Sequence, residues 1–171
     1  MDLYMVILRI LHIGAGILWV GFAVFMLYFG SPAARSMQDR GLRYTHALLN
    51  VTPFGNVMSA VALVTVIAGF LLYLRVSGTF NAAWLSSPGG IVLTIGSVAG
   101  VLAAGHGFTG IRSALYNQKA IVDAVVAQNS PPTPEQGAQL QAAGQRMGRN
   151  SQIGVILMII TVLGMSMARY V

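Results

Sequence analysis

The sequence predicts an all-α membrane protein, a four-helix up-and-down bundle, from its composition and from the spacing of its apolar segments. Of its 171 residues 56% are hydrophobic and only 8% are charged, and the mean hydropathy is +0.71, values typical of membrane proteins. A helix needs about 20 apolar residues to cross the hydrocarbon core. Four segments meet this length, at about residues 3–30, 51–74, 90–113 and 151–169. We therefore expect one transmembrane domain over residues 1–171.

The first apolar segment, residues 3–30, is predicted to be a retained membrane helix. It is longer than the apolar core of a signal peptide, and no small-residue cleavage site follows such a core. Gly30 and Pro32 predict its end. The following polar stretch "SMQDRGLRYTHALLN" is expected at the membrane interface, or as an extension of the second helix, with Pro53 causing a kink or a new helix start.

The two later connections differ in character. Residues 75–90 are rich in Gly, Ser and Pro, and Trp84 within them is interpreted either as a headgroup anchor or as a lid over a site. The polar segment at about residues 114–150 contains a turn, after which Thr133 is the predicted N-cap and Pro134 the first helical residue. We expect this segment to extend the third and fourth helices into the cytoplasm as a helical hairpin.

The basic residues predict the orientation in the membrane. The first and third connections carry Arg35, Arg40, Arg43, Arg112, Lys119, Arg146 and Arg149. The opposite side has only Arg9, Arg75 and Arg169. Because cytoplasmic loops carry the excess of Lys and Arg, both termini are expected outside. The net charge of +6 needs no nucleic-acid partner, since the basic residues are not interleaved with aromatic residues on one face.

The available ligand types restrict the chemistry. The sequence has no cysteine, which excludes disulfides, thiolate metal sites, iron–sulfur clusters and covalent c-type haem attachment. Copper handling is disfavoured, because the closely spaced pair Met165 and Met167 points to different sides of a helix. The four carboxylates, Asp2, Asp39, Asp123 and Glu135, lie outside the predicted spans. Their position counts against ion-coupled transport, which normally uses an intramembrane acid.

The strongest candidate site lies on the first predicted helix. Steps of three and four residues place Arg9, His12, Gly16 and Trp19 on one helical face. This set suits a haem: histidine binds the iron, glycine leaves room for the ring, and arginine pairs with a propionate. The alternative is that His12 hydrogen-bonds a neighbouring helix and that Arg9 extends to the outer interface without a ligand.

His106, on the third predicted helix, is a second candidate axial ligand. Small residues recur along this helix at Gly96, Gly100, Ala103, Gly107 and Gly110. They fit either close helix packing or a slot for a porphyrin. From the outer side, His12 lies about 14 Å deep and His106 about 24 Å deep, so a shared iron is permitted but not required. His46 is expected to be solvated at the cytoplasmic side, or to belong to a separate site there.

Three segments resemble a known group of membrane proteins. They are "LHIGAGILWVGFAVFMLYFGSPAAR", "RYTHALLNVTPFGNVMSAVALVTVIAGFLLYL" and "GGIVLTIGSVAGVLAAGHGF". They resemble the small bacterial proteins grouped around the copper-resistance CopD-like domain and the HemJ-like membrane protoporphyrinogen oxidase. The resemblance implies a haem b-binding bundle in the bacterial plasma (inner) membrane, with His12 and His106 at the family's histidine positions. The oxidase pattern's lysine near the start of the third helix is missing, because this region reads "SSPGGIVL".

These features predict a b-type haem protein that transfers electrons to or from a quinone or a partner protein. The first alternative is a cofactor-free structural or accessory subunit of a larger membrane complex, or a homo-oligomer. A third possibility is an enzyme that oxidises porphyrins. All three place the chain in the lipid bilayer, and none involves nucleic acid.

Overall fold

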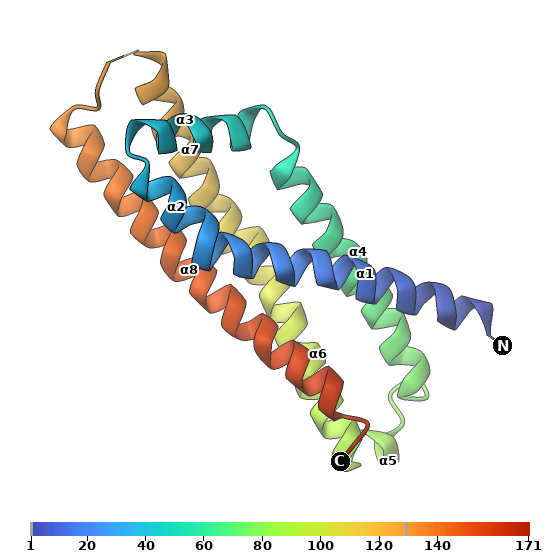
Figure 1. Ribbon diagram of the computed structural model, residues 1–171. Helices are drawn as coiled ribbons and strands as arrows, with labels where there is room; N and C mark the ends of the chain where they lie inside the picture. Colours follow the sequence, from blue (N-terminus) through green and yellow to red (C-terminus); the bar gives the residue numbers. More distant parts are fainter. Residues whose placement is uncertain (1, 129) are drawn as a thin grey trace.

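The computed structural model describes residues 2–128 and 130–171, and this part of the chain is helical without strands. Its α-helices are α1 (Leu3–Phe25), α2 (Ser31–Ser36), α3 (Asp39–Asn50), α4 (Phe54–Val76), α5 (Ala82–Leu85), α6 (Pro88–His106), α7 (Arg112–Ala127) and α8 (Pro134–Met167) (Figure 1). Two short π-helices, η1 (Met26–Gly30) and η2 (Gly107–Ile111), continue α1 and α6 without a break.

Four continuous helices are long and apolar enough to cross a membrane: Leu3–Ser36, Phe54–Val76, Pro88–Ala127 and Pro134–Met167. This confirms the predicted all-α class and the predicted number of helices able to span a membrane. The third has 40 residues, which corresponds to about 60 Å, whereas the hydrocarbon core is about 30 Å thick. Only part of this helix can therefore lie in lipid, and the apolar segment 90–113 is the part suited to it.

The segment between α1 and α4 differs from the prediction where α1 ends and agrees with it where α4 begins. The helix does not stop at Gly30 but continues through η1 into α2, where Pro32 lies in the first turn. Pro32 cannot donate a backbone hydrogen bond, and the π-helix η1 directly before it is where the regular hydrogen bonding of this continuous helix is interrupted. The predicted new start at Pro53 is confirmed, since Pro53 is the N-cap residue of α4. The polar stretch between the first two apolar segments contains a separate helix, α3, so it does not extend the second helix.

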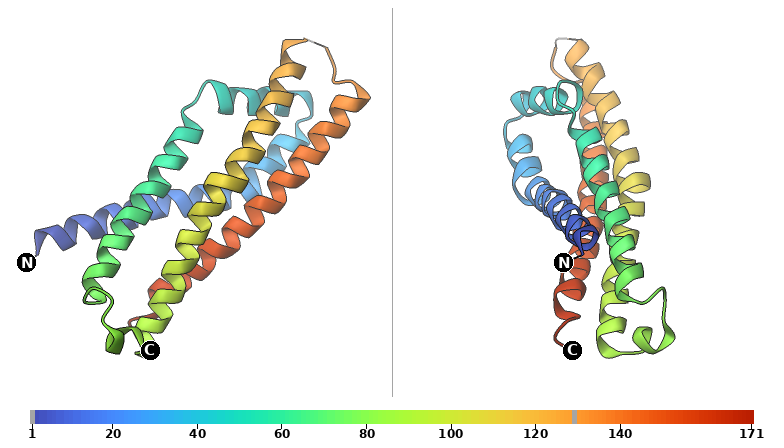
Figure 2. Two further views of the ribbon diagram at one scale, coloured as in Figure 1. Left: turned by 180° about the vertical axis from the view of Figure 1, so that it is seen from behind. Right: turned by 90° about the vertical axis from the view of Figure 1, so that its right-hand side faces the viewer.

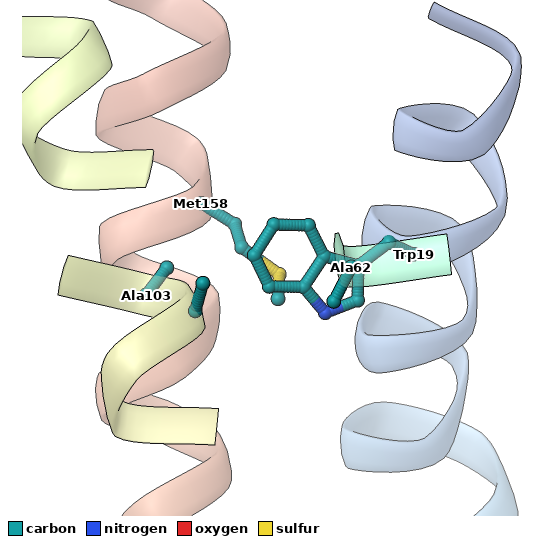
Figure 3. Close-up of a cluster of buried hydrophobic side chains, with 5 residues drawn as sticks. Trp19, Ala62, Ala103 and Met158 are labelled. Atoms are coloured by element: carbon teal, nitrogen blue, oxygen red, sulfur yellow. The ribbon is translucent and has the colours of Figure 1, made fainter. Parts of the chain in front are cut away.

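The long helices pack mainly as two pairs, α1 with α4 and α6 with α8. Figures 1 and 2 show α1 running obliquely across the other long helices. Trp19 connects the two pairs, because its buried ring packs in one cluster with Ala62 of α4, Ala103 of α6 and Met158 of α8 (Figure 3). This cluster is the core of the membrane-spanning region.

The glycines of α6 allow the close approach of α8. A Cβ atom at Gly164 would lie 2.8 Å from the Cα atom of Gly96, and one at Gly100 would lie 3.2 Å from Cγ2 of Thr161. Close packing therefore explains Gly96 and Gly100. Gly107, in contrast, has no such neighbour within 4 Å.

The start of α8 is the helix start that the sequence predicts. The Thr133 hydroxyl accepts a hydrogen bond from the Gln136 N–H at 3.2 Å, and the Gln136 side chain accepts one from the Thr133 N–H at 2.8 Å. This reciprocal pair is a capping box, which satisfies two backbone donors at the helix terminus. Pro134 occupies the first turn, as expected.

Candidate functional site

His12 is half-buried on α1 and is held by the backbone of α4. Its Nδ1 atom lies 2.8 Å from the carbonyl oxygen of Thr65. A carbonyl oxygen only accepts hydrogen bonds, so Nδ1 must carry the donated proton. In the neutral ring Nε2 then has a free lone pair. This is the arrangement in which a histidine typically binds a metal, with one nitrogen fixed by a carbonyl and the other available.

Gly69 makes room for the His12 ring. A Cβ atom at this position would lie 2.6 Å from Cε1 and 2.8 Å from Nδ1 of His12. Gly69 follows Thr65 by one helical turn, so the two residues form one face of α4 on which the ring rests. The sequence analysis missed both residues. The sequence does place Gly69 four residues after Thr65, on the same helical face. This spacing does not show that His12 of α1 lies against that face.

The other residues predicted to share the face of His12 have different environments. Gly16 faces α4, where a Cβ atom would lie 3.6 Å from Cγ2 of Thr65. Trp19 is 8% exposed in the core. Arg9 is exposed on α1 and forms no ion pair among the described residues. The structure thus brings His12, Gly16 and Trp19 together against α4, whereas Arg9 extends outward.

His106 belongs to the other helix pair. Its Nε2 atom lies 3.0 Å from the carbonyl oxygen of Asn150 on α8, and the Asn150 side-chain amide donates a hydrogen bond to the carbonyl oxygen of Gly110, also at 3.0 Å. Gly110 lies in the π-helix η2, where the regular i→i−4 hydrogen bonding is interrupted. Asn150, which sequence analysis missed, therefore links α8 to both ends of this segment.

The structure does not bring the rings of His12 and His106 together. Trp19, which belongs to the core cluster, comes seven residues after His12, so His12 lies about 10 Å from the core along α1. Ala103, in the same core cluster, lies one turn before His106. Each ring is bonded to a carbonyl of its own neighbouring helix. Joint ligation of one iron by His12 and His106 stays a prediction.

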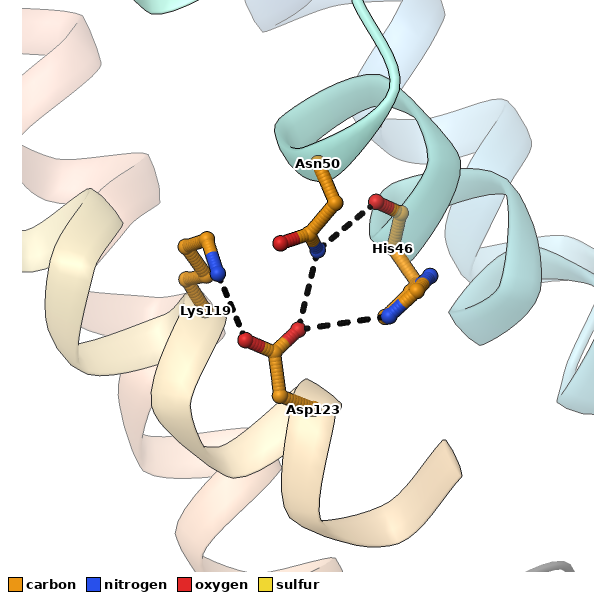
Figure 4. A network of polar contacts seen from close by, with 4 residues as sticks. All are labelled: His46, Asn50, Lys119 and Asp123. Carbon is orange, nitrogen blue, oxygen red and sulfur yellow. Dashed lines mark hydrogen bonds and ion pairs between the residues drawn. The ribbon is translucent and has the colours of Figure 1, made fainter. Parts of the chain in front are cut away.

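His46 faces a cluster of polar side chains between α3 and α7 (Figure 4). Its Nε2 atom is 3.6 Å from Oδ1 of Asp123, and the same oxygen accepts a hydrogen bond from the Asn50 amide at 2.9 Å. Lys119 donates a hydrogen bond to the second carboxylate oxygen at 2.6 Å. Asp123 lies beyond the apolar segment 90–113, and the hydrogen bond from Lys119 is the main reason why its pKa is below the ordinary value.

We expect acidic pH to weaken the contact of α3 with α7, because protonation of Asp123 weakens its bonds to Asn50 and His46 of α3. Because the pKa of Asp123 is lowered in the folded protein, its contribution to stability is present above the pKa of an unfolded aspartate, about 4. It is lost as the pH falls through the lower folded value. A spin label at Ala47→Cys, in a chain otherwise free of cysteine, should become more mobile as the pH falls below about 4.

Two substitutions test whether Asp123 causes this weakening. Asp123→Asn should raise the label's mobility already at pH 6 and flatten its pH response. Asp39→Asn, which changes an exposed acid on α3 itself, should leave the response of the parent chain intact. An unchanged response in Asp123→Asn would show that other groups hold α3.

Trp84 has a packing contact at the opposite end of the molecule. Its ring meets that of Tyr73 edge-on, with centroids 5.7 Å apart. The hydroxyl of Tyr73 is in turn 2.6 Å from that of Thr94. These contacts join α5, α4 and α6. They leave both the anchor and the lid interpretations of Trp84 open.

Among residues 2–128 and 130–171 there is no group of three or more His, Asp or Glu side chains that could hold a metal ion. A surface pocket of about 450 Å³ lies near the start of α1, beside the ion pair of Asp2 and Arg75 at 3.7 Å. The pocket lining does not include His12. The candidate site is therefore a single histidine on an α4 surface of Thr65 and Gly69.

The fold and this site define an all-helical chain with four helices long and apolar enough to cross a membrane, the first of which carries a histidine that is hydrogen-bonded to the backbone of α4. Comparison with protein-family models, with curated proteins and with solved structures found no match. The resemblance to the CopD-like and HemJ-like proteins therefore stays a prediction.

Proposed function

We propose that the chain is a b-type haem protein that transfers electrons within the membrane, with His12 as an axial ligand. The observation that carries this proposal is the 2.8 Å hydrogen bond from Nδ1 of His12 to the Thr65 carbonyl. It fixes the ring and leaves Nε2 free to bind iron. A carbonyl partner also raises the basicity of a histidine ligand.

The isolation of His12 favours a haem over a free metal ion. Protein sites for zinc commonly use three or four ligands, and no such cluster is found over the residues that the structure describes. A haem brings four equatorial nitrogens of its own and needs only axial ligands from the protein. One fixed histidine is thus sufficient for a haem and insufficient for a free ion.

When bound, the haem would supply one-electron chemistry, and the chain would determine where that chemistry takes place. Thr65 would hold the His12 ring in one orientation, and Gly69 would let the ring lie close to α4. Arg9, one turn away from His12, would offer a positive charge to a propionate. The electron partner would be a quinone or another protein. His106 is the proposed second ligand, to the same iron or to another one.

The proposed setting is the bacterial plasma (inner) membrane. We propose an up-and-down arrangement with both termini outside and with α7 and the start of α8 extending into the cytoplasm. The distribution of arginine and lysine supports it, because Arg146 and Arg149 lie in α8 just before the apolar segment 151–169, whereas Arg169 alone follows that helix.

An optical spectrum tests the proposed function. The purified protein should show a Soret band and, after reduction, a sharp α-band in the reduced-minus-oxidised difference spectrum. The preparation should be made from cells with an adequate haem supply, and the haem content should be measured against protein. Protein that is colourless under these conditions and takes up no added haemin would overturn the proposal.

A cofactor-free subunit of a larger membrane complex is the second candidate. It is favoured by five glycines of the apolar helical segments that have nothing within 4 Å of an added Cβ atom, namely Gly14, Gly21, Gly55, Gly105 and Gly107. Glycines in membrane helices often allow another helix to approach closely. Colourless protein that co-purifies with a partner in fixed ratio would favour this function.

A further inference from the structure

A groove separates the end of the first long helix from α3. It has a volume of about 250 Å³ and is lined mainly by Phe25, Phe29, Ala33, Ala34, Met37 and Tyr44. Several of these side chains are well exposed, with Phe29 at 63% and Met37 at 51%. Exposed apolar side chains in a concave site indicate an apolar ligand.

The groove has a defined shape because α3 folds back tightly on α2. A Cβ atom at Gly41 would lie only 1.8 Å from the carbonyl oxygen of Ala34, so the two backbones are in direct contact there. Gln38, in the turn between the two helices, has a left-handed backbone with φ of 53°. Any side chain at position 41 would force α3 away from α2 and open the groove.

Three arginines lie in the two short helices that form one side of this groove, α2 and α3. Arg35, Arg40 and Arg43 are exposed, and none of them forms an ion pair within residues 2–128 and 130–171. Arg40 lies one turn before Tyr44, a groove residue, on the same face of α3. The unpaired Arg40 therefore lies one helical turn from the groove residue Tyr44 on α3.

The order of apolar and basic residues along this part of the chain matches the two parts of a lipid molecule. α1 has 23 residues, which gives a length of about 35 Å, slightly more than the hydrocarbon core. Phe25 and Phe29 lie at the end of this apolar stretch, in α1 and η1, and the arginines of α2 and α3 follow them in the chain. The groove therefore lies where the chain changes from apolar to basic, as a lipid changes from acyl chain to headgroup.

We propose that this groove binds one anionic phospholipid, with an acyl chain between Phe29 and Tyr44 and the phosphate at Arg40 and Arg43. Arginine binds phosphate oxygens in a bidentate manner. A zwitterionic headgroup is a poorer match, because its ammonium group would meet the same arginines. The inference is independent of haem, since His12 and its α4 contacts do not line the groove.

Lipid retention tests this site. The whole chain would be purified in mild detergent, mixed with equal amounts of phosphatidylglycerol and phosphatidylcholine, and examined by native mass spectrometry. Wild-type protein should retain one phosphatidylglycerol in preference to phosphatidylcholine. The double variant Arg40→Gln/Arg43→Gln should bind phosphatidylglycerol about 30-fold more weakly, since each basic group contributes roughly fivefold near anionic lipid.

Two further variants separate the groove from general surface charge. Arg146→Gln/Arg149→Gln removes the same charge from exposed positions of α8 and should keep the bound lipid. Ala33→Leu keeps every charge but fills the groove, and it should reduce retention of phosphatidylglycerol. Equal retention of the two lipids, equal loss in the two arginine pairs, or full retention in Ala33→Leu would each overturn the proposal.

Discussion

Replacing His12 with alanine is expected to reduce the haem content of the purified protein to less than about a tenth of the wild-type value. The substitution removes the one nitrogen that the α1–α4 contact leaves free for iron. It also removes the hydrogen bond to the Thr65 carbonyl, but such bonds contribute only about 0.6 kcal/mol in membrane helices, so the helices should still assemble. Haem per protein and the Soret absorbance measure the result.

Comparison with the other histidines makes this test specific. His46→Ala should retain the full haem content, because His46 lies in the polar cluster with Asp123. His106→Ala tests the proposed second ligand. Retained haem with an altered α-band in this variant would mean that His106 binds the same iron as His12. Wild-type haem content and an unchanged spectrum in His12→Ala would remove His12 from the ligand set.

Gly69→Ala tests the position of the ring without removing the ligand. The added methyl group would lie within 3 Å of two atoms of the His12 imidazole, so the ring must turn or move. We expect a shifted α-band or reduction potential together with partial haem loss. Gly14→Ala is the matched control, because no neighbour lies within 4 Å of its added Cβ.

The bilayer explains why so much of the fold could be predicted. A membrane helix must satisfy its own backbone hydrogen bonds and cover about 30 Å of hydrocarbon, so length and hydropathy suffice to find it. The start of α8 was equally predictable, because a capping box depends only on neighbouring residues such as Thr133 and Gln136. These features are local, and a local sequence pattern determines them.

The partners of the site residues could not be predicted, because they depend on the register between distant helices. His12 and Thr65 are 53 positions apart, and His106 and Asn150 are 44 apart. A shift of one turn between α1 and α4 would give His12 a different carbonyl while leaving every helix in place. The periodic small residues of α6 fitted either a close helix contact or a slot for a porphyrin, and they did not show that Gly164 would lie against Gly96.

Gly164→Leu is expected to cause the largest loss of stability, about 3 kcal/mol in the free energy of unfolding. A Cβ atom at this position would lie 2.8 Å from the Cα atom and 3.0 Å from the backbone nitrogen of Gly96. Backbone atoms cannot move aside as a flexible side chain can, so α6 and α8 would have to separate. Unfolding by sodium dodecyl sulfate, followed by circular dichroism, measures the change.

The alanine variants show whether this loss comes from the helix contact or from the glycine itself. Alanine favours helix over glycine by about 1 kcal/mol, so Gly105→Ala, with no neighbour within 4 Å of its Cβ, should be neutral or slightly stabilising. Gly164→Ala has the same intrinsic gain but must push against Gly96, and it should unfold more easily than wild type. Equal stability of the two alanine variants would mean that α6 and α8 do not depend on direct backbone contact at Gly164.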